Sequence, residues 1–505
     1  MGTNLASLLS DSAERSPDSP AIRLGELELS FGRLDDASAR MAALLREKGV
    51  QPGDRIGVML PNVPQFPIAY YGVLRAGAIV VPMNVLLKRR EIAFYLEDSG
   101  TKLLLAWHGF IEEARGGAED AGAELIEVEP ASFPELVGSA DPMAGLADVS
   151  DDDTAVILYT SGTTGKPKGA ELTHANLSRN AEISSRTTCE IDAGDIVLGA
   201  LPLFHSFGQT VGMNASLRVG ACLALVPKFD PGEALETIQR NKVTHFYGVP
   251  TMFGALLHHP ERERFDTSSL RTCITGGASM PVDVLRGFEG AFGCIVLEGY
   301  GLSETSPVAS SNHPDKERKP GSIGTPLEGV EMRVVDEDGK PVEQGEVGEI
   351  AIRGHNVMKG YWQRPDATGE AMRSGWFHSG DMARTDEDGY FYIVDRKKDL
   401  IIRGGYNIYP REVEEVLYEH PKIREAAVIG VPHDEWGEEI GAAVVLHEGE
   451  ELGPDEVSSY VKDRIAAYKY PRVVWFLDDL PKGPTGKILK REIETPAAVQ
   501  SPPAA

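Results

Sequence analysis

The chain has 505 residues, of which 42% are hydrophobic and 25% are charged, a balance that excludes a globally disordered protein. Its 50 Lys and Arg residues against 77 Asp and Glu residues give a formal net charge of −27, which argues against nucleic acid as a partner. The four cysteines form no Cys-x-x-Cys pair, so we expect free thiols in a cytoplasmic protein rather than a zinc or redox site. The most apolar stretch, 69–87, contains Arg75 and Pro82, and it predicts a helix followed by a strand, not an integral membrane segment.

The first part of the chain alternates helical periodicity with short apolar runs. Helices are predicted over 36–48, 66–75 and 91–99, and buried strands over 55–60, 78–81 and 103–106. This rhythm favours layered α/β subdomains around a largely parallel sheet.

The pattern changes between 330 and 392, where short alternating strands (331–335 and 348–352) and Asp-Gly turns predict a small antiparallel, barrel-like part. From 399 onward a compact α+β unit is predicted, with strands at 400–402, 426–431, 441–445 and 473–477 and helices at 410–420 and 454–465. We expect the charged stretch 395–399 to join the large N-terminal domain to this C-terminal unit. We therefore predict a large N-terminal domain (1–397), a hinge at Lys398, a small mobile C-terminal domain (399–494) and a disordered tail (495–505).

The segment 158–169, Leu-Tyr-Thr-Ser-Gly-Thr-Thr-Gly-Lys-Pro-Lys-Gly, follows an apolar strand at 155–159. Its glycines allow backbone N–H groups to surround an oxyanion, while its hydroxyls and lysines add donors and charge. The spacing is not that of a Walker A loop, because Pro167 interrupts it. We interpret the segment as a polyphosphate cradle between a strand and a helix.

Four further stretches contain residues suited to a nucleotide and an acid. Glu304 in 298–305 (Glu-Gly-Tyr-Gly-Leu-Ser-Glu-Thr) can hold Mg²⁺ beside phosphates, because this cation takes few carboxylates and several phosphate or water oxygens. His205 lies between two aromatic residues and suggests a pocket wall, although a lone histidine is more often structural. Asp381 follows a glycine and can accept hydrogen bonds from ribose hydroxyls. Lys487 lies in a predicted loop that is rich in glycine and proline, and taken alone it would be interpreted as a surface lysine.

Together, in this order and spacing, these stretches resemble the adenylate-forming superfamily of acyl-CoA synthetases, aryl-CoA ligases, luciferases and peptide-synthetase adenylation domains. The resemblance covers about residues 5–493 and is nearest to the bacterial fatty acyl-CoA ligases. It implies that the β- and γ-phosphates of ATP are bound by Thr160, Ser161, Gly162, Thr163, Thr164, Gly165, Lys166 and Lys168, with Ser303 close by. It further implies Mg²⁺ at Glu304 and Thr160, adenine beside Gly277, Glu298, Gly299 and Tyr300, and ribose on Asp381 and Arg396.

The same resemblance implies the catalytic residues and the remaining sites. Lys487, Glu304 and His205 would be catalytic, with Lys487 bridging the carboxylate and the α-phosphate. The acyl pocket would consist of His205, Phe207, Val211, Gly301, Pro307 and Val308, and the coenzyme A tunnel would pass Gly404 and Gly405. Rotation about Lys398 would withdraw Lys487 between the two half-reactions.

The implied reaction is ATP-dependent formation of an acyl-AMP and pyrophosphate, followed by transfer of the acyl group to coenzyme A. Small residues such as Gly208 and Gly212 suggest a deep slot and favour a medium- or long-chain fatty acid; a hydroxycinnamate-type acid is the alternative. Loading of a carrier protein or a luciferase-like oxygenation also stays open. An amino acid is disfavoured, because no acidic residue between 201 and 227 could pair its ammonium group. The oligomeric state is open, a homodimer included.

Overall fold

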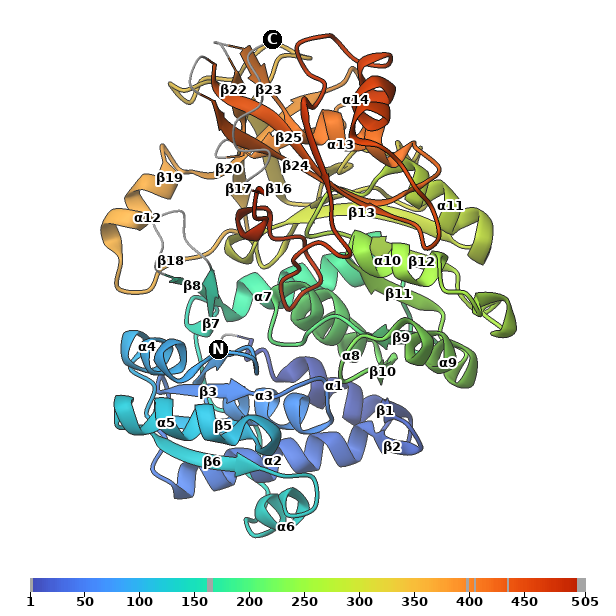
Figure 1. The fold of residues 1–505 in the computed structure, drawn as a ribbon. Coiled ribbons are helices and arrows are strands. Elements are labelled where there is room, and N and C mark those ends of the chain that lie inside the picture. Colours follow the sequence, from blue (N-terminus) through green and yellow to red (C-terminus); the bar gives the residue numbers. More distant parts are fainter. Residues whose placement is uncertain (1–2, 161–166, 397–398, 404–405, 434–435, 497–505) are drawn as a thin grey trace.

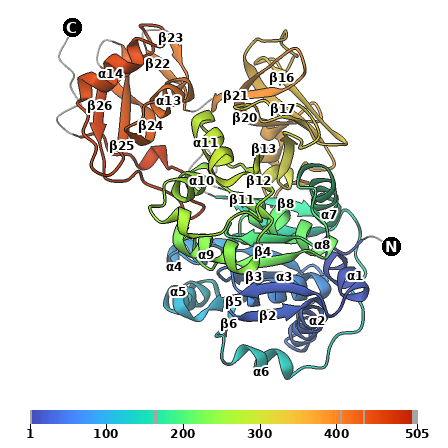
Figure 2. The same ribbon diagram turned by 90° about the vertical axis from the view of Figure 1, so that its right-hand side faces the viewer.

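The computed structural model describes residues 3–160, 167–396, 399–403, 406–433 and 436–496. Figure 1 shows the N-terminal layers at one end of the molecule and the last part of the chain at the other. In Figure 2 the C-terminal unit, carrying α13 (Pro410–Tyr418) and α14 (Pro454–Lys462), projects beside the antiparallel part that contains β16 (Val330–Val335), β17 (Gly348–Gly354) and β20 (Trp376–Thr385). Both parts lie against the edge of the large layered domain where α10 (Pro250–Leu257) and α11 (Val282–Phe292) are found.

The first sheet of the large domain has the order β18-β8-β7-β4-β3-β5-β6. Its strands are β3 (Arg55–Met59), β4 (Ile79–Pro82), β5 (Leu103–Trp107), β6 (Glu124–Val128), β7 (Thr154–Thr160), β8 (Lys168–Thr173) and β18 (Gly360–Tyr361). Pairing is parallel from β7 through β6, while β7–β8 and β8–β18 are antiparallel. The expected parallel core thus carries an antiparallel edge.

Helices cover both faces of this sheet because alternate strand residues point to opposite sides. Val58 and Leu105 belong to the main core with α2 (Phe31–Glu47) and α3 (Gln65–Arg75), whereas Met59 and Leu104 pack with α4 (Arg89–Ser99) and α5 (Ile111–Ala121). Helices α2, α3 and α4 begin before the helices predicted from 36, 66 and 91, whereas α5 was not predicted. The largest difference is at α2, where the Ser30 hydroxyl caps the helix by accepting from the Arg33 N–H.

The second sheet has the order β15-β14-β13-β12-β11-β9-β10-β1-β2 and is parallel in its centre, from β13 through β1. Its strands are β1 (Pro20–Leu24), β2 (Leu27–Ser30), β9 (Ile196–Gly199), β10 (Cys222–Leu225), β11 (His245–Gly248), β12 (Thr272–Thr275), β13 (Ile295–Gly301), β14 (Val308–Ser311) and β15 (Thr325–Pro326). The associated helices are α1 (Ser7–Arg15), α7 (His174–Ile183), α8 (Ala215–Val219), α9 (Pro231–Asn241), α10 (Pro250–Leu257) and α11 (Val282–Phe292), with π-helical segments over Ser184–Thr188 and Phe207–Asn214. Helix α6 (Phe133–Gly138) follows β6 of the first sheet and packs against α2.

The antiparallel part predicted from 330 onward contains β16 (Val330–Val335), β17 (Gly348–Gly354), β19 (Met372–Arg373), β20 (Trp376–Thr385) and β21 (Phe391–Arg396), with α12 (Pro365–Ala371) nearby. The C-terminal unit contains β22 (Ile401–Arg403), β23 (Tyr406–Ile408), β24 (Ile423–His433), β25 (Gly437–Leu446), β26 (Val473–Phe476), α13 (Pro410–Tyr418) and α14 (Pro454–Lys462). Its apolar side chains form cores of their own, separate from the main core of the large domain.

The α/β fold class with a large first domain and a small last one is therefore confirmed. The exact boundary and the mobility of the small domain stay predictions, and the proposed hinge Lys398 lies outside the described residues. None of the helices in the described ranges is both long and apolar enough to cross a bilayer.

Candidate active site

A cavity of about 1000 Å³ collects most of the residues singled out in the sequence. Its walls include Thr160, Lys168, His205, Phe207, Val211, Gly277, Gly299, Tyr300, Gly301, Ser303, Glu304, Pro307, Val308, Asp381, Arg396 and Lys487. These residues come from both sheets, from the antiparallel part and from the C-terminal unit. The fold thus brings together stretches that are more than 300 positions apart in the chain.

Glu304 lies at the meeting point of the two sheets. Its Oε1 accepts hydrogen bonds from the Tyr361 hydroxyl at 2.9 Å and from Thr160 Oγ1 at 3.4 Å. The described residues contain no cluster of three or more metal-ligating side chains. A single buried carboxylate beside a hydroxyl fits Mg²⁺, which completes its octahedron with water and phosphate oxygens, better than it fits a metal that needs a full protein cage.

The predicted phosphate cradle connects two antiparallel strands. Thr160 at the end of β7 pairs directly with Lys168 at the start of β8, so our expectation of a strand-to-helix loop was wrong. The Lys168 ammonium lies 5.3 Å from the centre of the Tyr361 ring, which keeps it at the cavity wall. Ser161, Gly162, Thr163, Thr164, Gly165 and Lys166 lie outside the described residues.

Asp381 and Arg396 form a direct cross-strand pair on β20 and β21. The buried Asp381 carboxylate accepts a 2.6 Å hydrogen bond from the Tyr300 hydroxyl, and its other oxygen lies 3.3 Å from Arg396 Nε. Burial, followed by the Asp381 charge, raises the pKa of Tyr300 well above its usual value, so the phenol stays protonated and donates. The Asp381 carboxylate, which we predicted to bind the ribose, is thus held in a fixed position.

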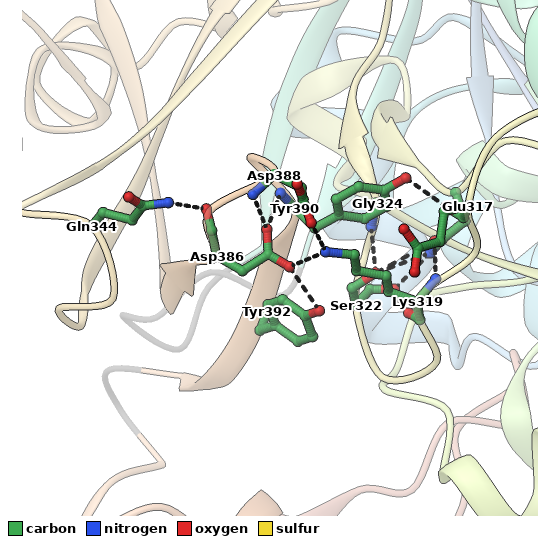
Figure 3. Close-up of polar contacts among 10 residues, drawn as sticks. Glu317, Lys319, Ser322, Gly324, Gln344, Asp386, Asp388, Tyr390 and Tyr392 are labelled. Atoms are coloured by element: carbon green, nitrogen blue, oxygen red, sulfur yellow. Dashed lines mark hydrogen bonds and ion pairs between the residues drawn. The ribbon is translucent and has the colours of Figure 1, made fainter.

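Lys319 holds the turn that joins these two strands. Figure 3 shows its ammonium between Asp386 and Asp388, with an N–O distance of 2.8 Å to Asp386, and the ammonium lies 4.7 Å from the centre of the Tyr390 ring. The two carboxylates raise the pKa of Lys319. The Asp386 carboxylate also accepts from the Tyr392 hydroxyl and the Tyr390 N–H, so one cluster fixes the end of β20 relative to β21.

His205 and Lys487 face the same cavity from different domains. Burial, and to a lesser extent the positive charge of Lys487, lowers the pKa of His205 to about 4, so the imidazole is neutral at pH 7. The loop that carries Lys487 is held by Thr251, whose hydroxyl donates to the Gly486 carbonyl at 2.7 Å. The C-terminal unit is therefore docked with Lys487 close to His205 in the wall of the cavity.

Gly301 allows two backbone segments of the cavity wall to approach each other closely. A Cβ on Gly301 would lie 2.1 Å from the Pro307 carbonyl oxygen, which no larger residue could tolerate. Phe207, Val211, Pro307 and Val308 line the same region. The walls predicted for the acid thus adjoin one another.

Glu298 is the exception among the described candidates, because it lines a neighbouring cavity of about 1420 Å³ rather than this one. The larger cavity shares Gly277, Gly299, Tyr300, Asp381 and Lys487 with the smaller. Glu298 Oε1 accepts from the Met280 N–H at 3.1 Å, and burial raises the pKa of this carboxyl to about 7.

Sequence reasoning missed several residues at the site. Tyr361 touches Glu304 across 57 positions, and no local pattern around it gave a signal. Ser184, Thr188 and Thr251 were missed for the same reason, although they contribute walls or contacts. Gly404 and Gly405, predicted to form a tunnel, lie outside the described residues.

Comparison with known proteins agrees with this geometry. The family model described as AMP-binding enzyme matches residues 9–362, and the model described as AMP-binding enzyme C-terminal domain matches residues 412–487. A long-chain-fatty-acid–CoA ligase of Bacillus subtilis is 40% identical over 97% of this chain and 94% of the ligase. A feruloyl-CoA synthase of Amycolatopsis is 41% identical over 95% and 96%, respectively.

A solved structure shares the fold over nearly its whole length. The benzoate CoA ligase from Burkholderia xenovorans superposes with a TM-score of 0.90 at 31% identity, covering 97% of this chain and 99% of that one. The family models, the similar proteins and the shared fold all agree with the motifs identified in the sequence. The chain therefore belongs to the AMP-binding enzymes and is an adenylate-forming ligase of the acyl- and aryl-CoA kind.

Proposed function

We propose that this protein joins an apolar carboxylic acid to coenzyme A in two steps. The acid carboxylate first attacks the α-phosphorus of ATP, which forms an acyl-AMP and releases pyrophosphate. The thiol of coenzyme A then attacks the acyl carbon, which forms the thioester and releases AMP. The observation that carries the proposal is the docking of Lys487 beside His205 in a cavity that also contains Glu304 and Asp381.

The first step brings two anions together and therefore needs positive charge at the reacting atoms. Lys487 supplies a cation from the docked domain, and Lys168 supplies a second one at the phosphate side. A preorganised donor of this kind is typically worth about 10²–10³ in rate. Mg²⁺, when held by Glu304 and Thr160, would add charge neutralisation on the phosphate oxygens.

A neutral His205 is suited to the wall of the site that binds the substrate acid. A protonated imidazole would compete with Lys487 for the carboxylate, whereas a neutral ring can close the slot and orient the acid. Tyr300, Gly277 and Gly299 would border the nucleotide, and Asp381 with Arg396 would bind its ribose. Ser303 would approach the phosphates.

The second step requires a different arrangement, because Lys487 occupies the wall that the two cavities share. We infer that the domain formed by 399–494 rotates about Lys398 relative to 1–397, and that Gly404 and Gly405 then border the route of the pantetheine arm.

Two classes of carboxylic acid are candidates for the substrate. A medium- or long-chain fatty acid is favoured by the similarity to the long-chain-fatty-acid–CoA ligase from Bacillus subtilis. An aryl acid is favoured by the similarity to a feruloyl-CoA synthase and a benzoate CoA ligase. Transfer to a carrier protein instead of free coenzyme A is the remaining alternative for the acceptor.

Exchange of labelled pyrophosphate into ATP tests the first step. A panel of fatty, cinnamic and benzoic acids should support exchange with at least one member, and added coenzyme A should then release AMP in proportion to thioester. Absence of exchange with every acid would refute the proposed function. Exchange without thioester from free coenzyme A would point to a carrier thiol.

A further inference from the structure

The side chain of Asn180 binds the backbone of a residue in the wall of the smaller cavity. Asn180 belongs to α7, has 0% of its surface exposed and does not itself line the cavity. Its Nδ2 donates to the Val308 carbonyl at 2.8 Å, and its Oδ1 accepts from the Val308 N–H at 3.2 Å. Val308 lines the cavity in the region predicted to hold the acyl group. One buried amide thus holds both backbone groups of a wall residue.

The strand pairing at Val308 is irregular, which gives this side-chain amide its role. Tyr300 pairs with Ser310 and Gly301 with Val308, so the register between β13 and β14 shifts at this point. Such a bulge disrupts the regular ladder, although the backbone groups still need partners. A carboxamide has the same donor and acceptor as a peptide group. Asn180 can therefore replace the strand neighbour that Val308 lacks at the bulge.

A second asparagine holds the same carbonyl more weakly. Asn356 Nδ2 donates to the Val308 carbonyl at 3.1 Å, and the Asn356 carbonyl accepts from Ser306 Oγ at 2.8 Å. Without Asn180 the Val308 carbonyl would keep this donor, whereas the Val308 N–H would lose its bond to the Asn180 side chain. Replacement of Asn180 would thus shift Val308 within the wall while the segment around it stays attached.

Asn176, one turn earlier on the same face of α7, provides a comparison within the chain. Its Nδ2 donates to the His355 and Val357 carbonyls at 2.7 and 3.1 Å, and its Oδ1 accepts from the Thr173 N–H at 2.9 Å. Neither His355 nor Val357 lines the cavity. The two buried asparagines therefore make the same kind of bond, but that of Asn180 is to a residue of the cavity wall.

We propose that Asn180 is a positioning residue for the substrate acid, which it affects by fixing Val308 and without touching the acid; this inference rests on the proposed function. The residues predicted to bind the ribose are held separately, because Asp381 and Arg396 are a direct pair on β20 and β21. A shift of Val308 changes the shape of the acid site and leaves that pair in place. Loss of the Asn180 amide therefore weakens acid binding more than ATP binding.

Steady-state kinetics of the variant Asn180→Leu test the proposal, because leucine has a similar volume but no amide. The purified full-length protein is first assayed for pyrophosphate exchange with decanoate, cinnamate and benzoate, and the acid that gives the fastest exchange is used throughout. The KM values for this acid and for ATP are then measured in the wild type and the variant. We expect the KM for the acid to rise about tenfold, as the loss of two hydrogen bonds implies, while the KM for ATP stays within about twofold and kcat is nearly unchanged.

Asn176→Leu is the matched control for a general loss of stability. It removes three amide hydrogen bonds from the same helix, one more than Asn180→Leu removes from Val308. We expect both variants to melt at a lower temperature than the wild type. The KM for the acid should nevertheless stay within about twofold of the wild-type value in Asn176→Leu, since its partners lie outside the cavity wall.

An unchanged KM for the acid in Asn180→Leu would overturn the inference, and so would an equal rise in the KM for ATP or an equal rise in the acid KM of both variants. If Asn180→Leu does not fold, Asn180→Ala takes its place, and failure of both to fold would assign Asn180 to stability alone. Wild-type exchange with at least one acid would leave the proposed function standing in all of these cases. Absence of exchange with every acid would remove both.

Discussion

Arg411 ties the C-terminal unit to the large domain in the arrangement that brings Lys487 to the cavity. Its Nη1 donates to the Ile393 carbonyl at 2.6 Å and its Nη2 donates to the Gly321 carbonyl at 3.2 Å. Its Nε lies 3.5 Å from Glu415 on the same helix, and its side chain is only 12% exposed. Both carbonyls belong to the large domain, so these bonds depend on docking.

The variant Arg411→Met removes the two bonds and keeps most of the aliphatic stem. A hydrogen bond to a charged group contributes about 1.5–3 kcal/mol. Taking the lower value for each of the two bonds, Arg411 stabilises the docked arrangement by about 3 kcal/mol. That free energy corresponds to roughly a 150-fold change in the docking equilibrium. We expect acyl-AMP formation to fall by up to this factor, while the conversion of supplied acyl-AMP to thioester is retained.

The assay measures each half-reaction separately, by pyrophosphate exchange and by thioester formation from synthetic acyl-AMP. Arg472→Met is the matched control, because Arg472 donates to the Tyr470 and Ala467 carbonyls within the C-terminal unit, at 3.2 and 2.9 Å. Equal effects of the two variants on exchange would refute the reasoning. Parallel loss of both half-reactions in Arg411→Met would refute it as well.

Three further predictions concern the loop of Lys487 and a buried acid. Lys487→Ala should abolish acyl-AMP formation yet still convert supplied acyl-AMP, and equal loss of both would argue against two arrangements. Gly486→Ala should lower pyrophosphate exchange at least about tenfold, since Gly486 has a φ of +80° and a Cβ would lie 3.0 Å from Val249; an unchanged rate would contradict this. Burial raises the pKa of Glu298 to about 7, so the folded chain holds an extra proton below that pH and loses the associated stability as pH rises through it. Urea unfolding should therefore show Glu298→Gln gaining about 2–3 kcal/mol over wild type between pH 5 and 8, and a constant difference would disprove it.

The helices and strands between residues 36 and 106 could be predicted because their apolar periodicity is strong and their strands are buried. Strand β13 shows the limit of such reasoning. Its apolar run ends at Leu297, yet the strand continues to Gly301, because β14 pairs with its last residues. Pairing with a later segment extends a strand in a way that its own sequence does not signal.

The candidate site was predictable to the extent that its residues lie in contiguous motifs. Glu304, Asp381 and Lys487 stand in such motifs and reach one cavity. Tyr361 and Arg411 do not, since their roles arise from contacts with distant parts of the chain. The hairpin that holds Thr160 against Lys168 was misread as a strand-to-helix connection, because glycines and a proline mask the strand that follows.

The Thr251–Gly486 contact has a consequence for the order of events. Residues 483–484 and 487–488 border both cavities, so the docked loop separates them, and the proposed rotation of the C-terminal unit would remove this partition. One rigid displacement of the C-terminal unit would open both chambers in a single movement. The timing of AMP departure and thiol arrival would then be governed by one mechanical event rather than by the separate affinities of the ligands.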